Sequence, residues 1–354
     1  MSGGLSAGTP LQGKGLDDLR DRAAGALVGL AVGDALGATL ESTERDEKPL
    51  HMEMTGGGMH RLPAGAWTDE TSLALCLADS LIQRQAFVPH NVMRRFLRWW
   101  LDGENSALGY CFDIGQTTLE ALGRFLRTAE AFAGSRAEET SGNGSIVRLA
   151  PVAIFRHGHR DAARNEACAQ SSLTHDSALC LEACELLVTI LLEALDGAAK
   201  VEVLRPRPWI GHPAVSLLAG GAWKRKSRAQ IRSGRYVLDT LEAALWAVEN
   251  AGGFEEALVA AVNLAGDADG VGAVTGQLAG AIWGLSAIPD RWLKPLWSRE
   301  AIEWRAYALL DAGASNRAYE RHACVRAAKA ARRTSGRERW DWSPRHPATP
   351  DPHG

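Results

Sequence analysis

Two short acidic clusters carry the residues of this sequence that are best suited to chemistry. One is Thr68-Asp69-Glu70 and the other is Asp267-Ala268-Asp269, and each directly precedes a stretch with the apolar periodicity of a helix. A single Asp or Thr at such a position caps a helix, because it satisfies free N–H groups and suits the helix dipole. Clustered carboxylates, however, repel one another unless a cation neutralises them, and hard oxygen ligands suit Mg²⁺ or Mn²⁺. The spacing leaves two interpretations open, helix capping and a divalent metal site.

Other reactive motifs fit less well. An EF-hand loop counted from Asp267 would have its glycine at Gly272, but Leu278 stands where that loop needs glutamate. The segment from Gly270 to Gly276 has one residue too many for a dinucleotide-binding fingerprint and follows no clear strand. Thr174-His175-Asp176-Ser177 contains the residue types of a hydrolytic triad, but neighbours in sequence cannot face one another in triad geometry. Capping or substrate contact is the better interpretation of that segment.

The elements that must position these residues are helices. Apolar residues recur at three- and four-residue spacing through most of the chain, which predicts about a dozen helices. Alternating strands are lacking apart from a short β-branched candidate at Val201 to Val203, so we expect an all-α fold. No connector marks a sure boundary, and we predict one compact domain over residues 16–334. The Gly/Ser-rich residues 1–15 and the Pro/Arg-rich residues 335–354 are predicted to be flexible tails.

Two of the predicted helices contain glycine at every fourth position. Gly25, Gly29, Gly33 and Gly37 form one such row, and residues 272, 276, 280 and 284 form the other. Each interior glycine costs about 1 kcal/mol relative to alanine, so close packing of the helix backbones must offset the cost of both rows. Because Asp34 lies in the first row and Asp267 and Asp269 precede the second, this packing would also bring acidic residues toward the centre of the protein.

Composition excludes several classes of function. The chain has 354 residues, is 46% hydrophobic and 23% charged, and carries a formal net charge of −3. It is therefore not a disordered protein, and its near charge balance predicts neither nucleic-acid nor membrane binding. No segment approaches the roughly 20 apolar residues of a membrane span, and the N-terminus has no apolar signal core. We expect a cytoplasmic protein.

Several segments, taken in order, resemble the ADP-ribosylglycohydrolase family. They begin with the segment from Ala24 to Gly37 followed by Glu41, and continue with Trp67-Thr-Asp-Glu-Thr71, Phe112-Asp-Ile-Gly-Gln-Thr-Thr118, Gly142-Asn-Gly-Ser-Ile-Val-Arg148, Leu173-Thr-His175 and residues 263–280. No single motif is specific, but the ordered combination is. The resemblance implies a compact, single-domain orthogonal helical bundle that binds two divalent cations, Mg²⁺ or Mn²⁺, in a cleft for ADP-ribose.

The resemblance also assigns roles to individual residues. The implied metal ligands are Thr68, Asp69, Glu70, Asp267 and Asp269. The implied catalytic residues are Glu41, on a mobile loop over about residues 41–58 that gates the cleft, together with Asp69 and Asp113. The implied substrate contacts are Gly115, Ser141, Gly142 and Asn143, whose backbone N–H groups would face the diphosphate, and His175 on the ribose side. The family usually has threonine where this chain has Gly270, a change expected to weaken at least one metal site.

The leading hypothesis for function is a divalent-metal-dependent glycosidase. It would remove mono-ADP-ribose from a side chain of a modified protein, with arginine as the expected linkage, by cleaving the N-glycosidic bond. The alternative, based on Gly270 and on the two predicted tails, which could reach a partner, is a weakened or inactive family member. Such a protein would bind ADP-ribose or act as an immunity protein against an ADP-ribosyltransferase toxin.

Overall fold

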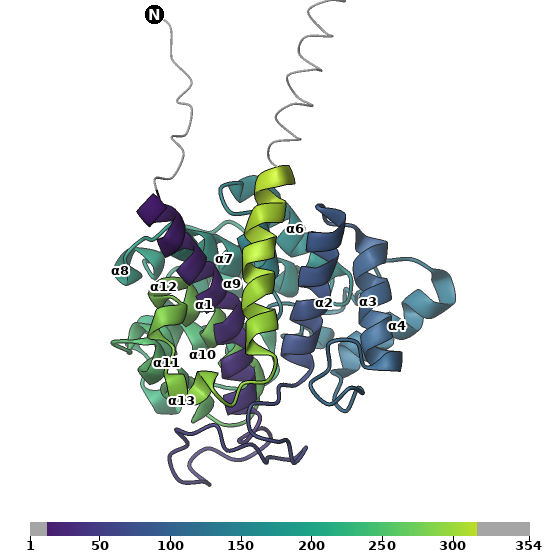
Figure 1. Ribbon diagram of the computed structural model, residues 1–354. Helices are drawn as coiled ribbons and strands as arrows, with labels where there is room; N and C mark the ends of the chain where they lie inside the picture. Colours follow the sequence, from purple (N-terminus) through teal and green to yellow (C-terminus); the bar gives the residue numbers. More distant parts are fainter. Residues whose placement is uncertain (1–12, 317–354) are drawn as a thin grey trace, which may run out of the picture. The chain divides into compact units, whose positions relative to one another are not determined.

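The computed structural model describes residues 13–316 of the chain, and every regular element in this range is a helix (Figure 1). This confirms the predicted all-α fold. The only ladder contacts among the described residues are three isolated bridges, Gly57 to Leu62, Ser135 to His175 and Gly142 to Tyr236. The β-branched segment at Val201 was wrongly considered as a strand, because it lies in a short helix at Lys200–Val203. A segment of this length does not distinguish the two periodicities.

The helices follow the predicted apolar runs closely. In chain order they are α1 (Gly13–Gly37), α2 (Asp69–Arg84), α3 (Pro89–Asp102), α4 (Gln116–Thr128), η1 (Glu138–Thr140), α5 (Ala150–Phe155), α6 (Arg160–Ser172), α7 (Ala178–Leu195), α8 (Lys200–Val203), α9 (Pro213–Ala219), η2 (Ala222–Arg225), η3 (Arg228–Gln230), α10 (Val237–Glu249), α11 (Phe254–Val262), α12 (Ala268–Trp283), η4 (Leu285–Ala287) and α13 (Asp290–Leu293). A further helix covers residues 299–316.

The predicted tails lie almost entirely outside the described residues. Helix α1 begins at Gly13, three residues before the predicted start of the domain. The chain divides into a compact unit at Met1–Ala314 and a second unit at Ser315–Gly354, of which nearly all residues are outside the described range. The domain boundaries 16 and 334 therefore remain predictions. Within residues 13–316, no helix is long and apolar enough to cross a bilayer.

The two glycine rows face each other along α1 and α12. A methyl group added at Gly276 would lie 2.5 Å from the carbonyl carbon of Gly29 and closer still to its oxygen. The same holds at the next contacts, where Gly33 meets Gly272 and Gly37 meets the backbone of Ala268. Only glycine allows two helix backbones to approach this closely. The antiparallel pair places Asp34, near the end of α1, beside the first turn of α12.

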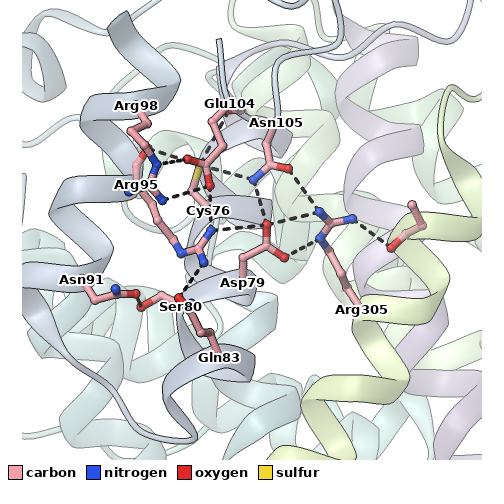
Figure 2. Close-up of polar contacts among 11 residues, drawn as sticks. Cys76, Asp79, Ser80, Gln83, Asn91, Arg95, Arg98, Glu104, Asn105 and Arg305 are labelled. Atoms are coloured by element: carbon pink, nitrogen blue, oxygen red, sulfur yellow. Dashed lines mark hydrogen bonds and ion pairs between the residues drawn. The ribbon is translucent and has the colours of Figure 1, made fainter. Parts of the chain in front are cut away.

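A polar network fixes α2 and α3 against the final helix (Figure 2). The Asp79 carboxylate on α2 accepts hydrogen bonds from Arg305 Nε at 2.7 Å and from Asn105 Nδ2 at 3.0 Å. Arg95 on α3 donates to Glu104 at 2.6 Å. These charge-assisted hydrogen bonds tie α2 to its neighbours, and most residues of α2, including its N-terminal turn, are buried.

Candidate active site

Most of the predicted site residues line one cleft of about 370 Å³. Its walls come from the loop after α1, the first turns of α2, α4 and α12, the turn before α5, and the loop before α10. The lining residues are Glu41, Asp69, Glu70, Asp113, Ile114, Gly115, Gln116, Thr117, Thr118, Gly142, Asn143, Gly144, His175, Arg235, Asp267 and Asp269. Two predicted site residues, Thr68 and Ser141, are buried and do not line the cleft.

The first acidic cluster lies at the N-terminus of α2, and its helix is capped from elsewhere. Asp34, fully buried on α1, accepts hydrogen bonds from the backbone N–H of Thr68 and of Thr71, each at 3.0 Å. It also accepts from their hydroxyls, at 2.8 Å for Thr68 and 2.6 Å for Thr71. Burial nevertheless raises the pKa of Asp34 to about 7. Since Asp34 performs the capping, Asp69 and Glu70 are not required for it, and the Thr68 hydroxyl is directed at Asp34.

The second acidic cluster lies at the N-terminus of α12, and its side chains are also largely not used for capping the helix. Asp267 occupies the N-cap position without a side-chain capping bond, whereas Asp269 accepts the N–H of Gly270 at 2.9 Å. Both oxygens of Asp267 have other donors: Arg235 Nε lies 3.1 Å from Oδ1, and Asn143 Nδ2 lies 2.6 Å from Oδ2. Burial raises the pKa of Asp267 to about 6, against the effects of Arg235 and Asn143.

The two clusters face each other across the cleft. Burial, followed by the charges of Asp69 and Asp269, raises the pKa of Glu70 well above its usual range. Burial, followed by the charges of Asp267 and Glu41, does the same for Asp269. Buried carboxylates that destabilise one another's charge form the donor set that a hard divalent cation neutralises. Asp69, Glu70, Asp267 and Asp269 therefore have the chemistry of the predicted metal ligands. Among the described residues, the candidate ligand atoms that lie within 4.8 Å of one another belong to a different group, Glu41, His60 and Asp113.

Gly270 has a steric explanation. A Cβ at this position would lie 2.7 Å from Asn143 Nδ2 and closer still to Asp267 Oδ2. The Asn143 amide, which also donates to Thr240 Oγ1 at 2.9 Å, occupies the space that the side chain of a threonine would need. Glycine at 270 and the hydrogen bond from Asn143 to Asp267 are thus two parts of one arrangement.

A third group of charges surrounds Glu41, whose side chain is only 1% exposed. His60 Nε2 lies 3.3 Å from Glu41 Oε2 and 3.2 Å from Asp113 Oδ2, and Arg235 donates to Glu41 Oε1. Burial and the Asp113 charge raise the pKa of Glu41, whereas Arg235 and His60 oppose that shift. Neither His60 nor Arg235 was predicted from the sequence, because each lies in a loop without periodicity or a recognisable motif.

The loop that follows Glu41 is anchored at several points in this structure. Arg45 donates to the carbonyls of Leu264, Arg228 and Ile231 at 3.1, 2.7 and 2.6 Å. The N–H of His51 donates to Asn263 Oδ1 at 2.8 Å. These bonds hold the loop against the segment that leads into α12, and the predicted gating movement of residues 41–58 remains a prediction.

The predicted contacts to a diphosphate need one correction. The N–H groups of Ser141, Gly142 and Asn143 donate to the carbonyls of Glu138, Thr140 and Arg235 at 3.1, 2.8 and 3.0 Å, so the structure does not present them to a ligand. The Ser141 hydroxyl instead pairs with Ser177 at 2.8 Å. The Gly115 N–H helps to stabilise the charged form of Asp69. Gln116, Thr117 and Thr118 in the first turn of α4 line the cleft, and a helix N-terminus favours an anion.

His175 reaches the cleft from a buried position. Its Nδ1 lies 2.7 Å from Thr174 Oγ1, which accepts a hydrogen bond of 2.7 Å from the buried Arg148. Thr174 accepts from Arg148 and can donate its hydroxyl hydrogen to Nδ1, an arrangement in which Nε2 carries the ring proton. Burial and the Arg148 charge lower the pKa of His175 to about 3, so the imidazole is neutral at physiological pH. The glycines at 142 and 144 pack directly on this ring.

Comparison with known proteins assigns the chain to a class. The sequence pattern of the ADP-ribosylglycohydrolase family matches residues 16–319, and the chain belongs to this family of glycosidic hydrolases. It is 48% identical to the ADP-ribosylarginine hydrolase Tri1 of Pseudomonas putida (strain GB-1), over 82% of this chain and 78% of that protein. It is 32% identical to the ADP-ribosyl-[dinitrogen reductase] glycohydrolase of Rhodospirillum rubrum, over 78% and 91% of the two chains.

A solved structure gives the same assignment. The chain matches a protein from an "ADP-ribosylglycohydrolase-related protein complex" with a TM-score of 0.74 and 43% identity. The match covers 84% of this chain and 99% of the other. The predicted family and its fold are thereby confirmed.

Proposed function

We propose that this protein is a divalent-metal-dependent hydrolase that removes mono-ADP-ribose from arginine side chains of modified proteins. The observation that carries the proposal is the pair of buried carboxylate clusters facing each other across one cleft, in a chain 48% identical to an ADP-ribosylarginine hydrolase. That relative and a second one from Serratia proteamaculans, 44% identical over 80% of this chain, support arginine as the linkage. We assign the protein to the cytoplasm, in keeping with the five free cysteines among its described residues.

The acidic clusters would hold two cations, Mg²⁺ or Mn²⁺. Asp69 and Glu70 would bind from the side of α2, and Asp267 and Asp269 from the side of α12. Thr68 would add its hydroxyl only by sharing it with Asp34, to which it now donates. Bound divalent cations supply orientation of the ribose hydroxyls and a lower pKa for water.

The other residues of the cleft would bind and orient the substrate. The first turn of α4 presents N–H groups and the positive end of the helix dipole, which suit a diphosphate. The neutral His175 would donate from Nε2 to an oxygen of the ribose. Together these groups would place the anomeric carbon between the two acidic clusters.

Proton transfer would fall to the carboxylates near His60. Hydrolysis develops positive charge on the ribose ring, while water loses a proton and the departing nitrogen gains one. Glu41 is the proposed general base, because burial and the Asp113 charge raise its pKa, against the effects of Arg235 and His60, and a raised pKa makes a carboxylate a better proton acceptor. Asp113, which shares His60 with Glu41, is the proposed acid/base or ribose-orienting group.

An assay with defined conjugates tests the proposal. The protein would be incubated with an ADP-ribosyl-arginine peptide and Mg²⁺ or Mn²⁺, and free ADP-ribose measured by mass spectrometry. We expect release from the arginine conjugate that EDTA and Asp69→Asn abolish, and slower release from a serine conjugate. Absence of release, with Asp69→Asn indistinguishable from wild type, would refute it.

The alternative of an inactive binding protein, or of an immunity protein for an ADP-ribosyltransferase, is not favoured. It rested on Gly270 and on the predicted tails. Gly270 fits the Asn143 and Asp267 arrangement sterically, and the tails lie almost entirely outside the described residues. The relatives named above are hydrolases.

A further inference from the structure

Arg235 lines the cleft and contacts two of its acidic residues. It lies in the loop between η3 and α10, and its side chain is 65% exposed. The guanidinium donates through Nη2 to Glu41 Oε1 and through Nε to Asp267 Oδ1, the latter at 3.1 Å. The proposed reaction gives Arg235 no direct part, although it lines the same cleft.

The two carboxylates that hold this guanidinium are fixed relative to each other. Their side chains are 1% and 6% exposed. The segments that carry them are joined by two backbone hydrogen bonds, from Ser42 N–H to Gly266 at 2.7 Å and from Gly266 N–H to Thr43 at 3.0 Å. Glu41 and Asp267 thus form a preorganised acidic pair whose spacing already matches the planar fork of a guanidinium.

The side chain of Arg235 can leave this pair while its backbone stays in place. The Arg235 carbonyl accepts the Asn143 N–H at 3.0 Å, and the Val237 N–H donates to Ser141 at 3.0 Å. The backbone on both sides of the residue is therefore anchored, whereas the side chain is exposed and can move into solvent. Because both carboxylates are buried, they lose their pairing when Arg235 leaves, and another cation must take its place.

We propose that Glu41 and Asp267 bind the guanidinium of the substrate arginine, with the Asp267 carboxylate shared between that guanidinium and the cation proposed above, and that Arg235 occupies this Glu41–Asp267 subsite as an internal substitute until the substrate displaces it. This inference rests on the proposed function, in which the leaving group is itself a guanidinium. A guanidinium substrate replaces Arg235 donor for donor, and neither carboxylate is left unpaired. A hydroxyl leaving group, as in a serine conjugate, offers no such exchange, so Arg235 would contribute to selection of the arginine linkage.

The test compares guanidinium binding in Arg235→Ala and wild type. Agmatine, which carries the arginine side chain without its carboxylate, would be titrated by calorimetry at saturating Mg²⁺, with butylammonium as a cation that lacks the planar fork. Because removal of Arg235 removes an internal competitor, we expect agmatine to bind about two- to fivefold tighter to Arg235→Ala. The affinity for butylammonium should change less. Adding Glu41→Gln to Arg235→Ala should abolish the increase in affinity for agmatine.

The matched control is Arg232→Ala. Arg232 lies in the same loop, is 75% exposed and pairs with Asp239 at 2.7 Å, outside the cleft. This variant should bind agmatine as wild type does. In turnover, Arg235→Ala should lower the KM for the arginine conjugate by a similar factor, a change that a merely structural role would not produce.

Two outcomes would overturn the inference. One is agmatine binding to Arg235→Ala that is equal to or weaker than wild type. The other is a higher KM in Arg235→Ala, which would make Arg235 a substrate-binding residue. If wild type hydrolyses the arginine conjugate and these results appear, the proposed function stands and the inference fails. If wild type hydrolyses no conjugate, the proposed function fails, and the calorimetry still decides whether the acidic pair binds guanidinium.

Discussion

Replacing Gly276 by alanine tests whether the α1–α12 contact is as close as the structure has it. The added methyl group would lie 2.5 Å from the Gly29 carbonyl carbon, 3.1 Å from the Leu30 nitrogen, and nearer still to the Gly29 oxygen. All of these are backbone atoms, so no side chain can rotate away, and the helices must separate by about 1 Å to restore ordinary contact.

The magnitude follows from two opposing effects. Alanine in place of glycine inside a helix stabilises by about 1 kcal/mol. Overpacking against a rigid neighbour costs typically 1–3 kcal/mol and sometimes more, and here the separation would also open contacts along the whole row (~3–5 kcal/mol in total). We therefore expect Gly276→Ala to lower the free energy of unfolding by about 2–4 kcal/mol, the difference between these effects.

The matched control is Gly123→Ala in α4. A Cβ at Gly123 would meet only the flexible end of Arg127, at 3.4 Å. The helix-propensity gain should then appear alone, raising the free energy of unfolding by about 0.5–1 kcal/mol. Urea unfolding followed by circular dichroism measures both variants. If Gly276→Ala proved as stable as wild type, the close approach of α1 and α12, and the placement of Asp34 beside the acidic residues of α12 that depends on it, would be refuted.

Three further predictions concern the cleft. Asp69→Asn removes a charge that raises the pKa of Glu70, so the variant should have a higher melting temperature than wild type in EDTA. It should also lose the rise in melting temperature that Mg²⁺ induces in wild type. Differential scanning fluorimetry measures both, and an unchanged melting temperature in EDTA would contradict the prediction. The folded-state pKa of His175, about 3, is below its unfolded value near 6.5, so its contribution to stability is complete above pH 6.5 and is lost as pH falls toward 3. His175→Gln should remove up to about 1.4 kcal/mol per pH unit of that slope in urea unfolding, and parallel pH profiles would argue against a neutral buried imidazole. Gly270→Thr should lower the free energy of unfolding by about 1–3 kcal/mol, as measured by thermal or urea unfolding. The loss should be smaller when Asn143 is also replaced by alanine. If the effects of the two substitutions on the free energy of unfolding were strictly additive, the two residues would not compete for space.

Much of this architecture could be predicted from the sequence because it is periodic. The apolar spacing of α7 or α10 depends on burial along one helix face, and the four-residue glycine rows require a close backbone partner whatever the rest of the fold is. The acidic clusters were recognisable because both stand at helix starts. Sequence alone did not decide between capping and metal binding, since that depends on Asp34, which performs the capping from a helix distant in sequence.

The residues that escaped prediction act through tertiary contacts from irregular segments. His60 and Arg235 are single charged residues in loops, and nothing in their neighbours indicates that they meet Glu41. The N–H groups of Ser141, Gly142 and Asn143 were predicted to face a ligand, but they complete hydrogen bonds to Glu138, Thr140 and the Arg235 loop. Backbone hydrogen bonds of this kind are fixed by distant segments, and local patterns do not reveal them.

The antiparallel contact between α1 and α12 also bears on how the chain acquires its site during synthesis. α1 leaves the ribosome long before α12, because more than 200 residues separate the two helices in the chain. Until α12 emerges, the glycine row of α1 has no backbone to pack against, and Asp34 and Glu41 stand without the carboxylates of the second cluster. Contacts this distant in sequence form late and slowly. A nascent or truncated chain that ends before α12 would therefore contain most of the helices, but its cleft would lack the second acidic cluster.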